Sequence, residues 1–299
     1  MDVTLVTCTQ MPEPDPDEQL LLDALGDVGV DARLCAWDDP AVDWGAAPLT
    51  VLRSTWNYTD DRDAFLAWTR RIAATRTTMR NPLGVIGANT HKSYLATLER
   101  AEVPVVPTRW FARGGKAADA EALRTLPWRR VIAKPAVGAG SRGVAAFDLE
   151  VEDEFAAAVA HLTELQARDD VLMQPQLESI RTEGELDIVW IDGEFTHAVT
   201  KLQRLASDDE HVTRAREVTE PELKIATRAL RTVEAFHQRE LLYARVDVAA
   251  DELGDLRVVE LELTEPSLFL AEHPPALKRF VAAIRRESGA VPDRIHPSQ

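Results

Sequence analysis

Residues 242–267 show the alternation of polar and apolar positions that is typical of a β-hairpin. An acidic, turn-like stretch at 251–255 divides this segment into two strands. Because successive side chains of a strand point to opposite faces, one face is expected to be apolar and the other polar. The apolar face is expected to hold Ala244, Val246, Val248, Val259, Leu261 and Leu263. The polar face is expected to gather Tyr243, Arg245, Asp247, Glu260 and Glu262.

The first part of the chain alternates between apolar strands and amphipathic helices. Strands are predicted at 3–7, 30–36 and 49–53, and helices at 17–26 and 63–74. This order predicts a small parallel sheet with crossover helices, forming an N-terminal α/β domain over residues 1–104. Near its end, Asn89 or Thr90 is expected to be the N-cap of a helix that runs to Arg100. A short Val-Val strand is predicted between Pro104 and Pro107.

Functional residues of parallel sheets usually follow the carboxyl ends of the strands. The string Arg53-Ser54-Thr55-Trp56-Asn57-Tyr58 occupies that place after the third strand. Its guanidinium, hydroxyl and amide groups could bind a small zwitterion or carboxylate. A polar loop around a packed Trp accounts for the same string, and the sequence leaves both interpretations open. Under the first interpretation the substrate ligands are Arg53, Ser54, Thr55 and Asn57.

The rest of the chain predicts two further α/β units, over residues 105–175 and 176–299. The first unit has strands at 131–135, 144–147 and 171–177 and a helix at 150–167. The second has strands at 186–191 and 194–202, joined by an Asp192-Gly193 hairpin turn, and helices at 221–239 and 275–287. The strand at 194–202 carries His197, expected to be structural, and Lys201.

A glycine-rich loop follows a strand that ends in a lysine. Lys134 closes the strand at 131–135, and three glycines fall within the next residues, at 138, 140 and 143, beside Ser141 and Arg142. Glycines let backbone N–H groups approach an anion closely, so the loop resembles a flap over phosphates. Its spacing is neither that of a P-loop nor that of a dinucleotide fingerprint. An ordinary hairpin turn is the alternative.

Composition and charge narrow the class of protein. A net charge of −16 excludes a binder of the nucleic-acid backbone, which needs a basic surface. The chain has no apolar run of about 18 residues for a membrane span, and its first residues lack the features of a signal peptide. Cys8 and Cys35 suggest no disulfide framework, so we expect a reduced, cytoplasmic protein.

Asp247, Glu260 and Glu262 on one polar face suggest a metal site. Two carboxylates at i and i+2 of a strand lie roughly 6.5–7 Å apart, and like charges at that distance repel unless a cation lies between them. Oxygen ligands on rigid strands suit Mg²⁺, which takes its remaining ligands from water and phosphates. A solvated outer face of a hairpin would show the same alternation.

The order of these motifs resembles the ATP-grasp superfamily. The motifs are Lys92, Lys134-Pro135, the Gly-rich loop, Gln174-Pro175-Gln176-Leu177, Glu183-Gly184-Glu185, Arg245-Val246-Asp247 and 260–267, Glu-Leu-Glu-Leu-Thr-Glu-Pro-Ser. Within that superfamily, the strings at 53–58, 134–143 and 260–267 are similar to those of D-cycloserine synthetases, which are O-ureido-D-serine cyclo-ligases. The resemblance implies an ATP-grasp fold, in which two α+β lobes grip ATP, preceded by the small parallel-sheet domain.

The resemblance also implies roles for individual residues. Lys92 and Lys134 would hold the phosphates, and either Glu185 or Glu183 the ribose. The closing loop would be Gly138, Gly140, Ser141, Arg142 and Gly143, and the adenine would be lined by Gln174, Gln176 and Leu177. Two Mg²⁺ ions would be bound by Asp247, Glu260 and Glu262, although the last ligand is commonly Asn in the family. Lys201 and Arg245 would stabilise the transferring phosphoryl group, and Glu265 and Ser267 would contact substrate.

The implied activity is an ATP-dependent carboxylate–amine ligation through an acyl phosphate. The closer resemblance implies a small amino-acid-like substrate, O-ureido-D-serine, that cyclises to D-cycloserine, and a homodimer. One alternative is a ligase that joins an amino acid to a separate amine or peptide. The other is a nucleotide-binding regulator without turnover.

Overall fold

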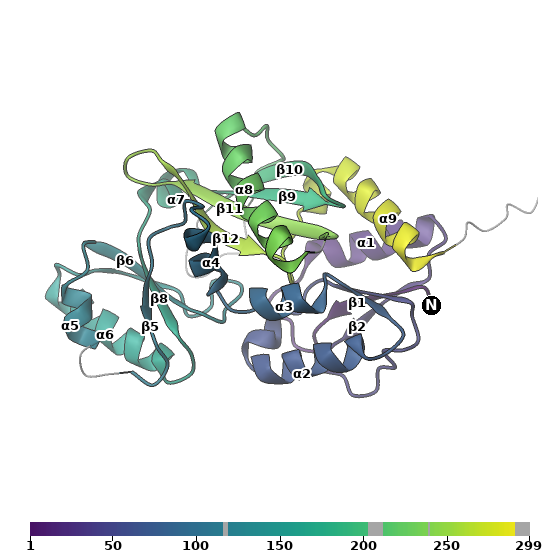
Figure 1. Cartoon of the computed structure of the whole chain (residues 1–299), viewed down its shortest axis with the longest axis horizontal. Helices are drawn as coiled ribbons and strands as arrows, with labels where there is room; N and C mark the ends of the chain where they lie inside the picture. The colour runs from purple at the N-terminus through teal and green to yellow at the C-terminus, as the bar shows by residue number, and fades with distance from the viewer. Residues whose placement is uncertain (116–118, 203–211, 239, 291–299) are drawn as a thin grey trace, which may run out of the picture.

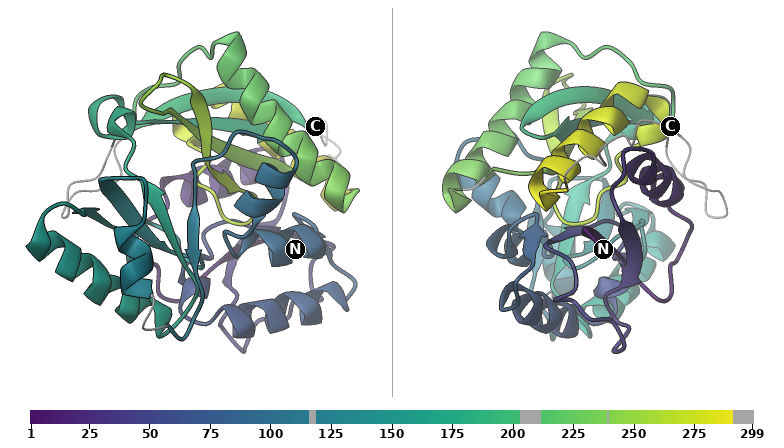
Figure 2. Two further views of the ribbon diagram at one scale, coloured as in Figure 1. Left: turned by 60° about the vertical axis from the view of Figure 1, so that its left-hand side comes forward. Right: turned by 90° about the vertical axis from the view of Figure 1, so that its right-hand side faces the viewer.

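The computed structural model describes residues 1–115, 119–202, 212–238 and 240–290. Its strands form three four-stranded sheets, one in each of three units. In Figure 1 the N-terminal domain lies at lower right, a central lobe at lower left and a C-terminal lobe across the top. The first view of Figure 2 keeps the same arrangement. The mixed α/β architecture agrees with the prediction.

The N-terminal domain is built on a parallel sheet of order β2-β1-β3-β4. Its strands are β1 (Val3–Thr7), β2 (Ala32–Ala36), β3 (Leu49–Leu52) and β4 (Thr78–Arg80), the last of which the sequence pattern did not predict. Two helices and a 3₁₀ turn connect them, α1 (Pro16–Asp27), α2 (Arg62–Ala73) and η1 (Trp56–Thr59). The parallel sheet confirms the predicted domain type, and the segment 53–58 leaves the carboxyl end of β3.

The central lobe carries an antiparallel sheet of order β5-β8-β6-β7. Its strands are β5 (Arg109–Phe111), β6 (Arg130–Pro135), β7 (Ala145–Asp148) and β8 (Val171–Pro175). The helices α5 (Asp119–Arg124) and α6 (Glu152–Gln166) cover one face, where Phe155 and Leu162 pack against Val131 and Met173. The Gly-rich loop therefore connects β6 to β7 at one end of this sheet.

The C-terminal lobe carries an antiparallel sheet of order β10-β9-β11-β12. Its strands are β9 (Glu185–Ile191), β10 (Glu194–Lys201), β11 (Tyr243–Ala250) and β12 (Leu256–Glu262). The helices of this lobe are α7 (Glu178–Glu183), α8 (Glu220–His237), η2 (Leu270–Glu272) and α9 (Pro274–Ser288). One face of the sheet is apolar and packs against α8, with Ile188, Val246 and Leu261 in that core.

The opposite face of this sheet changes character along its length. At one end Val189, Ile191 and Tyr243 pack against α9 and against residues of the N-terminal domain. At the other end the same face carries Asp187 and Arg245, together with their charged neighbours. The helix α9 lies beside α1, so both terminal regions of the chain contribute to one core (Figures 1 and 2). The N-terminal domain thus packs against the apolar end of this face.

Two expectations about the link between the first two units are wrong. Asn89 is the last residue of α3 (Leu83–Asn89), and the next helix, α4 (Tyr94–Arg100), begins after Ser93, so neither Asn89 nor Thr90 is its N-cap. The Asn89 side chain instead donates to the Leu261 carbonyl and accepts from the Leu263 N–H. The segment between Pro104 and Pro107 is no strand of a sheet, and only Val105 makes an isolated bridge, to β12.

Candidate active site

A cavity of about 600 Å³ lies where the three units meet. Its walls come from the Gly-rich loop, the strands β6 and β12, the segment 89–94 and the 3₁₀ turn η1. Many of the predicted site residues line it: Lys92, Lys134, Gly138, Gly140, Ser141, Arg142, Glu185, Lys201, Arg245, Glu260, Glu262, Glu265 and Ser267. Residues far apart in the sequence thus meet around one cavity.

The predicted carboxylate hairpin is present, and its register brings the acidic residues together. Arg245 pairs with Glu262 and Asp247 with Glu260 across β11 and β12. Three carboxylate oxygens, one from each of Asp247, Glu260 and Glu262, lie within 4.8 Å of one another. This separation and the all-oxygen donor set fit a hard divalent cation such as Mg²⁺.

One residue of the hairpin faces the other way from the prediction. The register shifts between Asp247 and Val248, where a β-bulge places an additional residue on β12. Val259 therefore leaves the apolar face, packs with Leu177 and Ala249, and lines the cavity. With Ile132 and Ile180 it provides apolar surface at the cavity.

Glu260 lies between two lysines. Its Oε2 is 2.8 Å from the Lys92 Nζ, and its Oε1 is 3.2 Å from the Lys134 Nζ. Burial opposes ionisation of this carboxyl, but the two lysines outweigh burial and lower the pKa of Glu260 well below its ordinary value. Burial likewise works against the charged form of Lys92, but Glu260 outweighs it and raises the pKa of Lys92. Both partners therefore remain charged.

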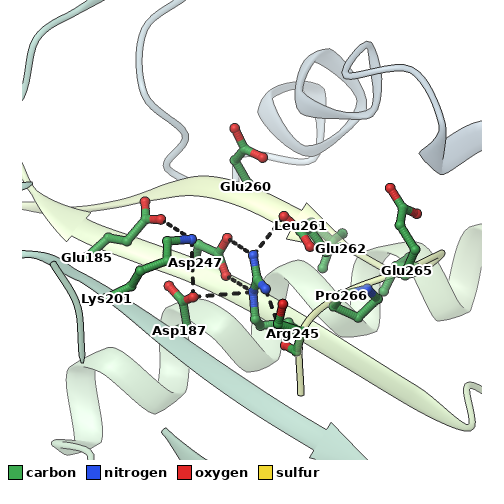
Figure 3. A network of polar contacts seen from close by, with 12 residues as sticks. Glu185, Asp187, Lys201, Arg245, Asp247, Glu260, Leu261, Glu262, Glu265 and Pro266 are labelled. Atoms are coloured by element: carbon green, nitrogen blue, oxygen red, sulfur yellow. Dashed lines mark hydrogen bonds and ion pairs between the residues drawn. The ribbon is translucent and has the colours of Figure 1, made fainter. Parts of the chain in front are cut away.

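A second ion-pair network covers the strands β9 and β11 (Figure 3). The Arg245 guanidinium lies 2.8 Å from Asp247 and 2.7 Å from Glu262. Lys201 pairs with Glu185 and lies 3.3 Å from Asp187, which is fully buried. Burial and the neighbouring Asp247 raise the pKa of Asp187.

Asp187 is a functional candidate that the sequence analysis missed. Its carboxylate groups with those of Glu185 and Asp247 within 4.8 Å, as a second set of oxygen ligands. The signal was available, because Glu185 and Asp187 stand at i and i+2 of one strand, as Glu260 and Glu262 do.

Burial and the nearby acidic residues also raise the pKa of Glu262 to about 7.

Glu265 stands in the loop that follows β12 and faces the cavity. The Tyr58 hydroxyl hydrogen-bonds its carboxylate, and the Trp56 Nε1 donates to its backbone carbonyl at 2.9 Å. Burial and the neighbouring Glu262 raise the pKa of Glu265 to about 8. Trp56 and Tyr58, which belong to the string at 53–58 but were not among the candidate ligands, both line the cavity.

The other members of that string lie beneath the cavity wall and are absent from its described lining. Arg53 is 1% exposed, donates to the Pro266 carbonyl at 3.0 Å and lies over the rings of Tyr243 and Phe280. The other three contact protein groups or are fully enclosed: Ser54 hydrogen-bonds Glu18, Thr55 is buried, and Asn57 contacts Trp37 and Asp38. Arg53 therefore supports the loop at 264–270, whereas Ser54 and Asn57 bond within the N-terminal domain.

The Gly-rich loop is held against the N-terminal domain. Arg142 pairs with Asp60 at 3.2 Å and donates to the Trp56 carbonyl and the Thr59 hydroxyl. Its guanidinium is thus engaged by η1. Gly143, whose φ is +74°, lies outside the described cavity lining, and a Cβ there would press against Leu165 at 3.3 Å. The glycine is required by backbone conformation and close packing.

The predicted nucleotide-base residues lie behind the wall of the cavity. Gln174 is buried and donates to Thr108, the Gln176 N–H donates to the Arg130 carbonyl, and Leu177 packs in the apolar cluster with Val259. None of the three is in the described lining. Of the two acidic candidates for the ribose, Glu185 lines the cavity, whereas Glu183 is exposed at the end of α7.

Comparison with known proteins shows the family. The family model described as the N-terminal domain of D-cycloserine synthetase DcsG matches residues 3–81 of this chain. The cycloserine biosynthesis protein DcsG of Streptomyces lavendulae is 32% identical over 293 residues, which cover 94% of this chain and 97% of that protein. The chain belongs to the DcsG family of ATP-grasp ligases.

Solved structures agree with this membership. The crystal structure of D-cycloserine synthetase DcsG has a TM-score of 0.85 and 31% identity, covering 95% of this chain and 99% of the other. The D-alanine–D-alanine ligase from Bacillus anthracis in complex with ATP has a TM-score of 0.64 at 13% identity, covering 96% of each chain. The predicted ATP-grasp fold is thereby confirmed. No described helix is long and apolar enough to cross a membrane.

Proposed function

We propose that this chain is an ATP-dependent carboxylate–amine ligase that cyclises O-ureido-D-serine to D-cycloserine. The observation that carries the proposal is the cavity between the lobes of a DcsG-family chain. It combines the two lysines on Glu260, the Arg245 guanidinium and two groups of carboxylates. Cations for phosphates and oxygens for Mg²⁺ are the two requirements of phosphoryl transfer from ATP.

Each part of the cavity has a task under this proposal. Lys92 and Lys134 bind phosphate oxygens, and the Gly-rich loop covers them. The apolar side near Ile180 and Val259 receives the base, and Glu185 binds the ribose. Asp247, Glu260 and Glu262 would hold two Mg²⁺ ions, which would supply positive charge next to the phosphates.

The chemistry has two stages. In the first, the substrate carboxylate attacks the γ-phosphorus, which gives an acyl phosphate and ADP. Lys201 and Arg245 stabilise negative charge on the transferring group. In the second, the nitrogen bonded to the side-chain oxygen attacks the acyl carbon and releases phosphate. Hydrolysis of the carbamoyl group to CO₂ and ammonia then leaves the five-membered ring.

An intramolecular nucleophile agrees with the size of the cavity. A volume of about 600 Å³ is that of a typical small-molecule site, and it must also accommodate ATP. Cyclisation needs no second substrate site, and the nearby nitrogen lowers the barrier through proximity. This favours cyclisation over ligation to a separate amine or a peptide. The completeness of the acidic and basic groups favours catalysis over nucleotide binding alone.

The test is a coupled assay of ADP formation with MgATP and O-ureido-D-serine, followed by mass spectrometry of the product. O-ureido-L-serine and D-alanine serve as controls. We expect ADP release with the D-ureido compound alone, and a product with the mass of cycloserine. ADP release with a separate amine as obligatory co-substrate would favour the intermolecular ligase. Binding of ATP without turnover on any of these compounds would refute the cyclisation.

A further inference from the structure

Glu265 differs from the other carboxylates at this site, because no cationic partner for it is found in the part of the chain that the structure describes. Five carboxylates of the C-terminal sheet each form an ion pair with Lys or Arg, namely Glu185, Asp187, Asp247, Glu260 and Glu262. Among the described residues, no Lys, Arg or His nitrogen lies within 4.0 Å of the Glu265 carboxylate, although this carboxylate faces the cavity. Glu265 is partly buried. A carboxylate that is partly removed from water without a counter-ion is unfavourable, and a cationic ligand relieves that cost.

The surroundings of Glu265 suit a small organic cation. The Tyr58 hydroxyl hydrogen-bonds the carboxylate, and the Trp56 ring lines the cavity next to the same loop. Aromatic faces attract cations, and charge-assisted hydrogen bonds to a carboxylate are the stronger kind. Figure 3 shows the side chains of Glu265 and Glu260 extending in the same direction from the segment that joins them. The cation would therefore lie on the side where phosphoryl transfer occurs.

A metal ion is a poorer occupant for this position. The carboxylates that gather within 4.8 Å of one another do so in two groups, and among the described residues neither group includes Glu265. Single carboxylates seldom hold Mg²⁺ without phosphates or further acidic ligands. Tyr58 offers a neutral hydroxyl in place of a second anion. The cation that fits is one that needs a single carboxylate and a hydrogen-bonding neighbour.

We propose that Glu265 binds the α-ammonium group of the amino-acid substrate and thereby sets the specificity of the site. This inference rests on the proposed function, because it places an amino acid in the cavity. In such a substrate the ammonium group is one carbon away from the carboxylate that is phosphorylated. Glu265 follows the metal-site residue Glu262 by three positions, on a loop fixed by Trp56. The segment 262–265 would therefore carry a metal ligand on the side of the phosphorylated carboxylate and also the ligand of the neighbouring ammonium group.

The experiment compares two ligands that differ only in this ammonium group, O-ureido-D-serine and 3-(ureidooxy)propanoate. Binding to the wild-type chain and to Glu265→Gln is measured by calorimetry with Mg²⁺ and a non-hydrolysable ATP analogue. Glu252→Gln, in the exposed turn between β11 and β12, is the matched control. The nucleotide affinity of each variant and its melting temperature establish that the site has folded.

We expect wild type and Glu252→Gln to bind the amino compound about 100-fold or more tightly than its des-amino analogue, as for other charge-assisted recognition. Glu265→Gln should lose most of that ratio and bind the des-amino compound as wild type does. Tyr58→Phe should weaken binding of the amino compound several-fold, and it serves as a second test if Glu265→Gln does not fold.

The outcomes separate this inference from the cyclisation. Three results would overturn the ammonium site. The ratio of the two affinities could stay unchanged in Glu265→Gln, the affinities for both ligands could fall equally, or the wild-type chain could fail to bind the amino compound. D-serine, which lacks the ureido group, is measured as a third ligand. If Glu265→Gln loses discrimination against D-serine and keeps it against the des-amino compound, Glu265 contacts the ureido group, and the ammonium site is also overturned. Selective binding without any ADP release would retain the ammonium site and refute the proposed reaction.

Discussion

Glu260 connects the charge of the two lysines to the carboxylate cluster. Its two oxygens pair with Lys92 and Lys134, and its single negative charge offsets only part of their positive charge. A triphosphate brings several negative charges to the same lysines, so it can take over both lysines and free the carboxylate for a cation. We infer that nucleotide and metal bind together because each removes a repulsion that the other would meet.

The substitution Glu260→Gln tests this exchange. We expect ADP release to fall by more than about 100-fold, the range found when a single electrostatic contact in a transition state is removed. The variant should fold but melt at a lower temperature, because two partly buried lysines lose their counter-ion. Nucleotide should restore part of that loss.

The companion substitution Lys134→Ala removes one lysine and leaves Lys92 on Glu260. It should also abolish ADP release while it leaves the fold intact. Glu194→Gln, exposed on β10, controls for loss of a carboxylate elsewhere. Near-normal turnover in either site variant would contradict the assignment. Steady-state ADP release and thermal melting, with and without MgATP, give all the readouts.

At the scale of elements, the Gly-rich loop and η1 act as one closing device. Arg142 makes three contacts to η1, to Asp60 and to groups of Trp56 and Thr59. The same turn carries Tyr58, which hydrogen-bonds Glu265. The flap over the phosphates and the predicted amino-acid pocket are therefore joined by a single side chain. We expect this link to keep water from the acyl phosphate.

Arg142→Ala should uncouple ATP consumption from ring formation. We expect the ratio of ADP released to cyclic product to rise several-fold above one, since a looser flap lets water reach the acyl phosphate. Arg142→Lys keeps the charge near Asp60 but cannot contact all three acceptors at once. Its ratio of ADP to product should therefore lie between those of wild type and Arg142→Ala. Parallel measurement of ADP and of product by mass spectrometry gives the ratio. A ratio that stays at one in Arg142→Ala would show that the contact has no role in closure.

The period of the strands explains why the acidic face of the hairpin could be predicted. The shared face of Asp247, Glu260 and Glu262 follows from alternation alone, and the observed register brings the three together. Val259 was placed on the wrong face because a bulge adds one residue between pairs, and no composition signal marks it. Alternation predicts the face to which a side chain points only where the hydrogen-bonded pairing of the two strands is regular.

Residues whose partners are remote in sequence could not be assigned. Arg53 has the chemistry of a carboxylate ligand, but its hydrogen bond is to Pro266, which is 213 positions away. Asn89 has the chemistry of a helix cap, but β12 binds its amide. In both cases local propensity was overridden by a tertiary contact. The fold class, by contrast, depended on the order of many motifs, and it was correct.

At the scale of the molecule, the loop at 264–270 is the point on which the units converge. The N-terminal domain holds it through Asp17, which accepts from the N–H groups of Leu268 and Leu270. The C-terminal sheet holds it through His197, which hydrogen-bonds the Leu268 carbonyl, and through Arg245, which donates to the Ser267 carbonyl. His197 thus has the structural role expected of it, because it helps to hold this loop. The N-terminal domain contributes to the active site by fixing the loop that carries Glu265.

Asp17→Ala tests whether that support matters for substrate binding. The change leaves two buried N–H groups without acceptors, at a cost of about 1–3 kcal/mol each, so we expect a loss of roughly 2–6 kcal/mol in the free energy of unfolding. The KM for the amino-acid substrate should rise more than the KM for ATP, because the proposed nucleotide contacts lie outside the loop at 264–270. Asp23→Ala, exposed on the same helix, is the matched control. If Asp17→Ala melts like the control with both KM values unchanged, the loop keeps its shape without the N-terminal domain, and specificity must arise within the two lobes alone.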